Sequence, residues 1–147
     1  MALDEAGIVK DANVRRLSSL HTALFRLSGG RLGRRLVDND MLLLTTVGAG
    51  TGREHTVPLL YLEYDDALVV VASYGGRPDH PQWFKNLLTH PRGRAQVGSE
   101  SFPVESAVAT AEERSVLWPK VVDAYDGYRV YQARTDRVIP VVLLRRG

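Results

Sequence analysis

The segment from Ser73 to Asn86, SYGGRPDHPQWFKN, holds the densest set of groups in this chain that could contact a ligand. Two glycines follow Ser73 and Tyr74, so the backbone there can turn closely. Trp83 and Asn86 are three residues apart at the start of a predicted helix, which places them on one helical face. These amides, hydroxyl, indole and carboxamide could surround one flat polar ligand. A tight turn with Trp83 in the core fits the spacing equally well, and both interpretations stay open.

A glycine-rich segment, GAGTG from Gly48 to Gly52, is the second candidate. Glycines at 48, 50 and 52 could let backbone N–H groups approach a phosphate. However, two predicted strands flank the segment, and it lacks the Lys-Ser/Thr ending of a P-loop. On the residues alone, a hairpin turn is the favoured interpretation.

Three tyrosines at three-residue steps, Tyr125, Tyr128 and Tyr131, form the third candidate. This spacing would place them on one helical face, although Gly127 weakens the helix. Such a stripe commonly packs in a core. The alternative is a pocket whose phenols stack on a substrate and donate a hydrogen bond.

Other kinds of chemistry lack the residues they need. The chain has no cysteine, which excludes disulfides, thiolate catalysis and cysteine-ligated metals. The histidines, at 21, 55, 80 and 90, share no metal-ligand spacing, and no G-x-S-x-G elbow is present. We therefore expect no metal site and no serine hydrolase.

Length and charge indicate one globular domain of 147 residues, with 44% hydrophobic and 24% charged residues. Residues 15–37 carry no acid but six arginines, at 15, 16, 26, 31, 34 and 35. They could form a solvated helix face, or a surface that meets anionic lipid or a negatively charged coenzyme tail. Nucleic acid is disfavoured because no aromatic interleaving accompanies the arginines. No signal peptide or membrane span is recognisable, so we expect a cytoplasmic protein, with peripheral membrane contact through the N-terminal helix left open.

Hydrophobic patterning predicts strands at 41–47, 55–64, 67–73, 94–98, 102–109 and 138–144. Strands 55–64 and 67–73 should form a hairpin, and Pro103 indicates an edge or a bulge. Helices are predicted at 13–28, after Pro81, and at 111–124, where Thr110 and Glu113 form a capping box. Short turns between strands favour a mainly β, α+β fold, an antiparallel barrel decorated with helices. We expect a flexible leader over 1–12 and a single domain over 13–147.

Several motifs in order carry a family resemblance: Leu43–Thr46 (LLTT), Thr56–Tyr61 (TVPLLY), Val71–Ser73 (VAS), His80–Trp83 (HPQW) and Tyr131–Thr135 (YQART). Together they resemble the deazaflavin (F420)-dependent nitroreductases, oxidoreductases of the split β-barrel, FMN-binding-like superfamily. The match runs from His21 to Leu143.

The resemblance implies hydride transfer from reduced F420 to an electron-poor acceptor such as a quinone, an enone or a nitroaromatic. It implies that the coenzyme ring lies against the Val71–Tyr74 strand end and the Trp83–Asn86 helix start. The negatively charged tail of the coenzyme would then cross the Gly48–His55 segment. The implied coenzyme-binding residues are Gly48, Gly50, Arg53, His55, Thr56, Val57, Pro58, Val71, Ala72, Ser73, Tyr74, Arg77, Gln82, Trp83, Phe84 and Asn86. Tyr125, Tyr128 and Tyr131 would shape the acceptor pocket, with Ser73 or Tyr128 as the catalytic proton donor.

The chain departs from the family where the tail binds. Relatives usually carry an arginine-lysine pair where Ala49 and Gly50 stand, an arginine at His55 and often a lysine at Tyr74. Nearby candidates to replace these cations are Arg53 and Arg77. Alternatives that would explain the departure are an FMN-dependent reductase of the same fold and a non-catalytic protein that binds a coenzyme or lipid. The sequence leaves monomer and homodimer both open.

Overall fold

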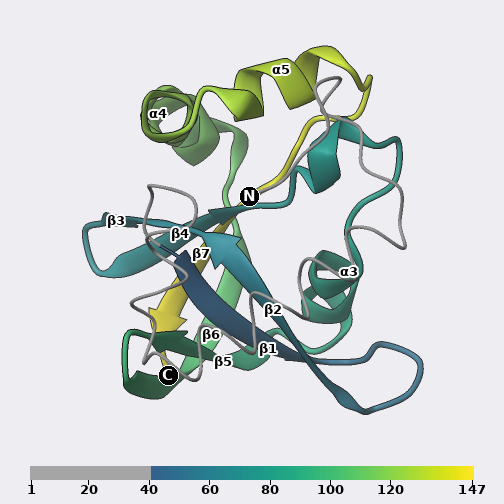
Figure 1. The fold of residues 1–147 in the computed structure, drawn as a ribbon, viewed down its shortest axis with the longest axis vertical. Coiled ribbons are helices and arrows are strands. Elements are labelled where there is room, and N and C mark those ends of the chain that lie inside the picture. The colour runs from purple at the N-terminus through teal and green to yellow at the C-terminus, as the bar shows by residue number, and fades with distance from the viewer. Residues whose placement is uncertain (1–40) are drawn as a thin grey trace.

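A computed structural model describes residues 41–147 of the chain, which form one curled antiparallel sheet with helices around it (Figure 1). The strand order is β2-β1-β5-β6-β7-β4-β3, and each neighbouring pair is antiparallel. The strands are β1 (Met41–Val47), β2 (Glu54–Leu60), β3 (Leu62–Tyr64), β4 (Ala67–Val71), β5 (Arg92–Val97), β6 (Glu100–Val108) and β7 (Val141–Arg146).

The two edge strands of this sheet, β2 and β3, are joined by a single residue, Tyr61. Seven flat strands would separate the two edges by roughly 29 Å, since adjacent strands lie about 4.8 Å apart. One residue spans about 3.8 Å. The sheet must therefore curl until its edges approach each other, and Figure 1 shows this curl. The predicted split antiparallel β-barrel is confirmed.

Strands β1 and β4 and the first four residues of β7 are buried on both faces, which explains their unbroken apolar sequences. On β4, Val70 packs in a cluster with Trp83 and Phe84, whereas Val69 packs in a second cluster with Tyr128. We call these the α3 cluster and the α4–α5 cluster. The α3 cluster comprises Leu42, Leu44, Val70, Ala72, Trp83, Phe84, Leu87, Ala95, Phe102, Val104, Val142 and Leu144. The α4–α5 cluster comprises Ala67, Val69, Val71, Leu117, Val121, Tyr128, Tyr131, Ile139, Val141 and Leu143.

The helical elements are η1 (Tyr74–Gly76), α3 (Gln82–Thr89), α4 (Ala111–Ala124) and α5 (Gly127–Ala133). The predicted capping box of α4 is confirmed: Thr110 Oγ1 accepts from the Glu113 N–H at 3.1 Å, and the Thr110 N–H donates to Glu113 Oε1 at 2.9 Å. Helices α4 and α5 lie together over one end of the sheet, and α3 lies beside β1 (Figure 1). The predicted leader and N-terminal helix lie outside the described residues.

Some predicted strand boundaries are wrong. The strand expected over 55–64 breaks at Tyr61, so β2 pairs with β1 and the predicted hairpin consists of β3 and β4. The strand expected over 67–73 ends at Val71. The last strand begins at Val141 rather than Val138, because the Ile139 N–H donates to a side chain and Pro140 has no N–H.

Pro103 marks neither an edge nor a bulge, because β6 lies between β5 and β7 and Pro103 pairs in register with Arg94. Its carbonyl accepts from the N–H of Gly147, one residue beyond the last β6–β7 pair, Val104 with Arg146. The nitrogen of Pro103 faces the same side, at the end of the ladder. The missing N–H of Pro103 therefore leaves no carbonyl of β7 without its hydrogen-bond donor in the ladder.

Candidate functional site

The turn after β4 has a backbone conformation that few residues adopt. Tyr74, Gly75 and Gly76 have φ angles of 48°, 66° and 79°, all in the left-handed region, which is strained for a tyrosine. The Gly76 N–H donates to the Ser73 carbonyl at 2.9 Å. A Cβ on Gly76 would lie 2.6 Å from the Tyr131 carbonyl oxygen, so glycine lets the turn approach α5. Backbone strain of this kind is typical of binding sites.

Several donors at this strand end have no partner among the described residues. Among residues 41–147, the backbone N–H groups of Ser73 and Gly75 donate to no other residue, and the Ser73 hydroxyl makes no hydrogen bond. Ser73 and Gly75 are half-buried. Because polar groups of this kind are normally satisfied by protein, water or ligand, the turn could hold an acceptor-rich molecule. The role predicted for amides near Ser73 has this geometric support.

An arginine that sequence analysis missed holds this turn in place. Arg137 donates from Nη1 to the Ala72 carbonyl at 3.1 Å, from Nη2 to the Ser73 carbonyl at 2.7 Å, and from Nε to the Arg77 carbonyl at 2.8 Å. Its Nη1 also lies 3.1 Å from His80 Nδ1. These partners are 57 to 65 residues away in sequence, so no local pattern indicates them. The position of Arg137 just after the Tyr131–Thr135 motif is the one available signal.

His80 is neutral in this arrangement. A guanidinium can only donate, so Nδ1 of His80 accepts and the ring proton is on Nε2. Burial, followed by the charges of Arg137 and Lys85, lowers the pKa of His80, while Asp79 opposes the shift. The His80 ring also packs against Phe84, with centroids 4.9 Å apart.

A buried polar network ties α3 to the turn between β1 and β2. Asn86 and Thr46 are both 0% exposed, and Asn86 Nδ2 donates to Thr46 Oγ1 at 3.0 Å. Asn86 Oδ1 accepts from the Ala49 N–H at 3.0 Å and from Gln82 Nε2 at 2.9 Å. Sequence analysis expected Asn86 to contact the coenzyme, which stays a prediction. In the structure its side chain anchors the turn.

The glycine segment is a hairpin turn between β1 and β2, as the residues alone favoured. The Gly48 N–H donates to the Arg53 carbonyl at 2.7 Å, and the Gly52 N–H donates to the Gly48 carbonyl at 2.9 Å. The Arg53 N–H donates to Thr51 Oγ1 at 3.2 Å. The Ala49 N–H donates to Asn86, as described above, so most backbone N–H groups from 48 to 53 already have an acceptor within the protein. The segment does not form a cradle of free amides.

Most of the remaining predicted coenzyme residues lie on β2, just before it, or on α3. Arg53 and His55 are exposed, Thr56 and Val57 are half-buried, and Pro58 is buried. Thr56 Oγ1 lies 2.7 Å from Thr45 Oγ1 on β1. Trp83 and Phe84 are 8% and 4% exposed and pack edge to face in the α3 cluster, where Ala72 is also buried.

The three tyrosines come together, although not on one helix. Tyr125 is the C-cap of α4, while Tyr128 and Tyr131 belong to α5. Their ring centroids lie 5.1 to 6.5 Å apart, and the Tyr125 and Tyr131 hydroxyls are 3.2 Å from each other. Burial raises the pKa of Tyr128 and of Tyr131. Both phenols therefore stay protonated and can donate hydrogen bonds.

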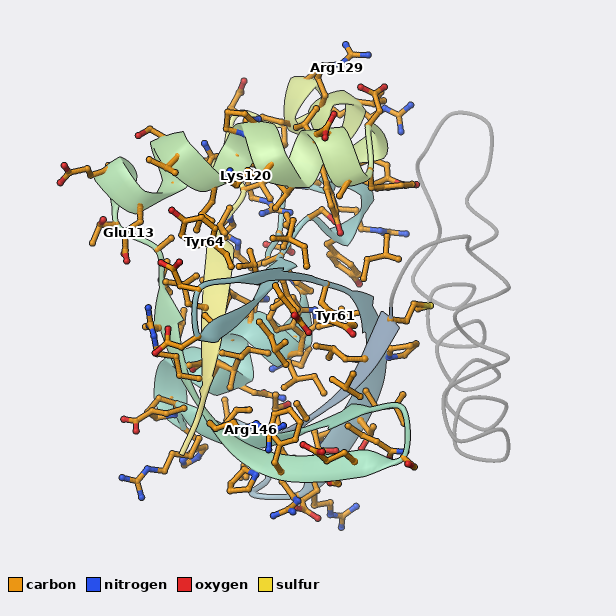
Figure 2. The ribbon with its side chains drawn as sticks, turned by 90° about the vertical axis from the view of Figure 1, so that its left-hand side faces the viewer. Tyr61, Tyr64, Glu113, Lys120, Arg129 and Arg146 are labelled. Atoms are coloured by element: carbon orange, nitrogen blue, oxygen red, sulfur yellow. The ribbon has the colours of Figure 1, made fainter. Side chains whose placement is uncertain are left out.

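A small hollow of about 20 Å³, enough for roughly one water, lies beside this tyrosine group. It is lined by Leu60, Tyr61, Leu62, Val69, Val71, Val121, Ala124, Tyr125 and Tyr128. Figure 2 shows Tyr61 between the strands and below the helices. Sequence analysis gave Tyr61 no role of its own, although it ends the TVPLLY motif.

Strand β4 divides the candidate residues into two groups. Ala72 belongs to the α3 cluster with Trp83, whereas Val71 belongs to the α4–α5 cluster with the tyrosines. The turn after β4 is linked to both sides. Gly76 lies against Tyr131, and Arg137, which holds the carbonyls of the turn, also contacts His80, whose ring packs against Phe84 of α3. A flat ligand at this turn would thus have the Trp83 helix on one side and the tyrosines on the other.

The part of the chain that the structure describes contains no group of three or more His, Asp or Glu side chains that could hold a metal ion. No described helix is long and apolar enough to cross a membrane.

Comparison with known proteins decides the family. A family model described as F420H(2)-dependent quinone reductase matches residues 17–146. The chain belongs to this family. It is 38% identical over 135 residues to a Mycobacterium tuberculosis protein named F420H(2)-dependent quinone reductase, covering 88% of this chain and 90% of that protein.

Two solved structures agree with this assignment to the F420H(2)-dependent quinone reductase family. A structure of an F420-H2 dependent reductase is 37% identical, with a TM-score of 0.66, covering 72% of this chain and 94% of that one. A structure described as a domain-swapped dimer is 34% identical, with a TM-score of 0.69, covering 86% of this chain and 96% of that one. The resemblance to F420-dependent oxidoreductases is confirmed.

The chemistry of the turn after β4 is compatible with the predicted coenzyme site. A flat, acceptor-rich ring needs donors and apolar walls, and the Ser73 and Gly75 amides, Trp83 and Ala72 supply both. The β1–β2 turn fits an anionic tail less closely. Ala49 and Gly50, where the resemblance leads us to expect cations, are exposed and uncharged.

Proposed function

We propose that this chain transfers hydride from reduced coenzyme F420 to a quinone. The observation that carries the proposal is the turn after β4, whose Ser73 and Gly75 amides donate to no described residue and whose carbonyls Arg137 holds. Family membership across residues 17–146 supports F420 as the coenzyme. An enone or a nitroaromatic is also a reasonable acceptor, because aromatic-lined pockets are permissive.

When bound, reduced F420 supplies a hydride, and a quinone that takes up this hydride and one proton becomes a quinol. The protein's own task is to bind, orient and exclude water. The Ser73 and Gly75 amides orient the ring, and Trp83 forms part of its wall. The buried phenols of Tyr128 and Tyr131 face the acceptor as hydrogen-bond donors. Ser73 or Tyr128 helps to deliver the proton to the acceptor oxygen.

Tail binding is the weak point of this site. Arg53 is exposed near the β1–β2 turn, and the Arg77 guanidinium lies 5.1 Å from the Tyr74 ring centroid. We infer that these two arginines replace part of the missing charge. Each lost charge-assisted contact costs about 1.5–3 kcal/mol, so F420 should bind more weakly than to relatives with the full set of cations.

A turnover experiment tests the proposed function. Purified protein is mixed with reduced F420 and menadione, and the visible absorbance of oxidised F420 is followed against a protein-free control. We expect protein-dependent oxidation of the coenzyme and formation of the quinol. Oxidation at the control rate refutes the proposal.

Binding experiments separate the alternatives. The chain has two tryptophans, Trp83 and Trp118, so a Trp118→Phe variant reports on Trp83 alone. F420 should quench Trp83 fluorescence at lower concentration than FMN does. Quenching by FMN alone would identify an FMN-dependent reductase, and F420 binding without turnover would identify a non-catalytic binder.

The location and assembly of the protein are further parts of the proposal. We infer a cytoplasmic protein whose predicted N-terminal helix can rest on an anionic bilayer, near a membrane quinone. Each of the six arginines within or just after this predicted helix would contribute about 1 kcal/mol at such a surface. Anionic vesicles should sediment the full chain at low salt and leave a variant that starts at Asp38 in solution. A homodimer is supported by the relative described as a domain-swapped dimer, and light scattering tests it.

A further inference from the structure

The segment between α5 and β7 is a rigid support for Arg137. Gln132 Nε2 donates to the Arg137 carbonyl at 2.8 Å, and Gln132 Oε1 accepts from the Ile139 N–H at 2.9 Å. Arg114 on α4 donates to Gln132 Oε1 at 3.1 Å and to the Ile139 carbonyl at 3.0 Å. Side chains from two helices, Arg114 of α4 and Gln132 of α5, thus fix the backbone at Arg137 and just after it. A side chain that starts from a fixed backbone loses less entropy when it binds its partners.

The Arg137 guanidinium is bound by neutral acceptors. Four hydrogen bonds use its N–H groups, three to carbonyls and one to His80. Within residues 41–147 no carboxylate forms an ion pair with Arg137. The carbonyls it holds belong to Ala72, Ser73 and Arg77, which flank the turn after β4.

Holding the Ala72 carbonyl determines where the Ser73 N–H points. A trans peptide is planar, so the N–H of Ser73 points opposite to the C=O of Ala72. The bond from Arg137 Nη1 to Ala72 therefore orients a donor that no described residue uses. An ammonium at this position could not reach three carbonyls at once, because its donors radiate from one atom.

We propose that Arg137 is a positioning residue of the coenzyme site, and that it orients the turn after β4 only while His80 is neutral. This inference rests on the proposed function of that turn. Protonated His80 could not accept from Arg137 and would place a second cation against the guanidinium. Lys85 on α3 adds to this repulsion, and Asp79 opposes it.

The direction of the pH effect follows from the same contacts. Burial and the neighbouring cations hold the pKa of His80 below its ordinary value of 6.5. The neutral ring therefore predominates at neutral pH, where the turn is ordered for binding. Coenzyme affinity should fall as the pH decreases through the lowered pKa of His80.

Arg137→Lys tests the positioning role, with Arg129→Lys as the matched control. Arg129 is a residue of α5. Its side chain is exposed, points away from the sheet (Figure 2) and forms an ion pair with Asp126. Arg137→Lys should raise the dissociation constant of F420 at least about tenfold, since charge-assisted bonds to the turn are lost. Arg129→Lys should stay within about twofold of the wild type. An Arg137→Lys variant that binds F420 as tightly as the wild type would overturn the proposal.

His80→Asn tests the pH dependence and stays informative if Arg137→Lys fails to fold. Asparagine keeps an acceptor oxygen but does not titrate. The affinity of the wild type should fall at low pH, and that of His80→Asn should fall less. Identical pH profiles in the two proteins would overturn the role of His80.

A measurement without coenzyme separates this inference from the proposed function. In the free protein, an NMR titration should give His80 a pKa below 6.5, and Arg137→Gln should raise it. A His80 pKa that Arg137→Gln leaves unchanged contradicts the inference. Failure of the wild type to bind F420, with the His80 titration as expected, contradicts the proposed function instead.

Discussion

The hydrogen bond between Asn86 and Thr46 offers a test of how the β1–β2 turn is held. Both side chains are 0% exposed, so neither can turn to water when its partner is removed. Asn86→Leu would leave the Thr46 hydroxyl without its donor, and Thr46→Val would leave Asn86 Nδ2 without its acceptor. The double variant removes both polar groups together and leaves neither buried and unpaired.

The magnitudes follow from where each lost partner lies. A buried orphan costs about 1–3 kcal/mol, whereas a bond that water can replace costs about 0.5–1.5 kcal/mol. Asn86→Leu also releases Ala49 and Gln82, which are exposed. We therefore expect about 2–6 kcal/mol of destabilisation for Asn86→Leu and about 1–3 kcal/mol for Thr46→Val. The double variant should be no less stable than Asn86→Leu.

Urea unfolding of the four proteins measures this coupling. Midpoint and slope give each free energy of unfolding, and the cycle gives the interaction energy, which should be at least about 1 kcal/mol. Gln82→Ala serves as a control, since it removes an exposed donor to the same Asn86 oxygen and should cost less than about 1.5 kcal/mol. If the costs of the two single substitutions sum to the cost of the double variant within about 0.5 kcal/mol, the reasoning is refuted.

Three further predictions concern the backbone, the acceptor side and the tail. Gly76→Ala should cost about 1–3 kcal/mol in thermal unfolding, because φ is 79° and the new Cβ meets the Tyr131 carbonyl at 2.6 Å, whereas Gly50→Ala, with open space, should be near neutral. Tyr128→Phe should leave F420 affinity unchanged and lower kcat and kcat/KM for the quinone together; lost coenzyme binding would place the phenol in the coenzyme site. Ala49→Arg with Gly50→Lys should tighten F420 binding, with a gain that shrinks as salt rises, and unchanged affinity at low salt would contradict the placing of the tail.

The sequence by itself determined those features whose cause is local. The MLLLTTV run predicted β1 with its observed bounds, and the Thr110–Glu113 spacing predicted the start of α4. Both depend on residues within a few positions of each other, as caps and strand patterns do. The ordered motifs also made the family recognisable, because each motif is a short, continuous stretch of the chain.

Tertiary structure alone decided how these pieces meet. The predicted strand over 55–64 looked continuous because its apolar residues run without a break from Val57 to Leu62, but Tyr61 divides it between the two edges of the barrel. A period of two tells which residues share a face of a strand, but not what covers that face. The pattern therefore could not show that Ala72 and Val71 face different clusters.

The polar contacts that hold the site were out of reach for the same reason. Asn86 and Thr46 are 40 residues apart, and Arg137 lies 64 residues from Ser73. The first bond exists because the fold places α3 beside the end of β1, and the second because it brings the segment before β7 to the end of β4. A side chain's donors are evident from its residue type, whereas its acceptors depend on which backbone carbonyls the fold leaves unpaired beside it.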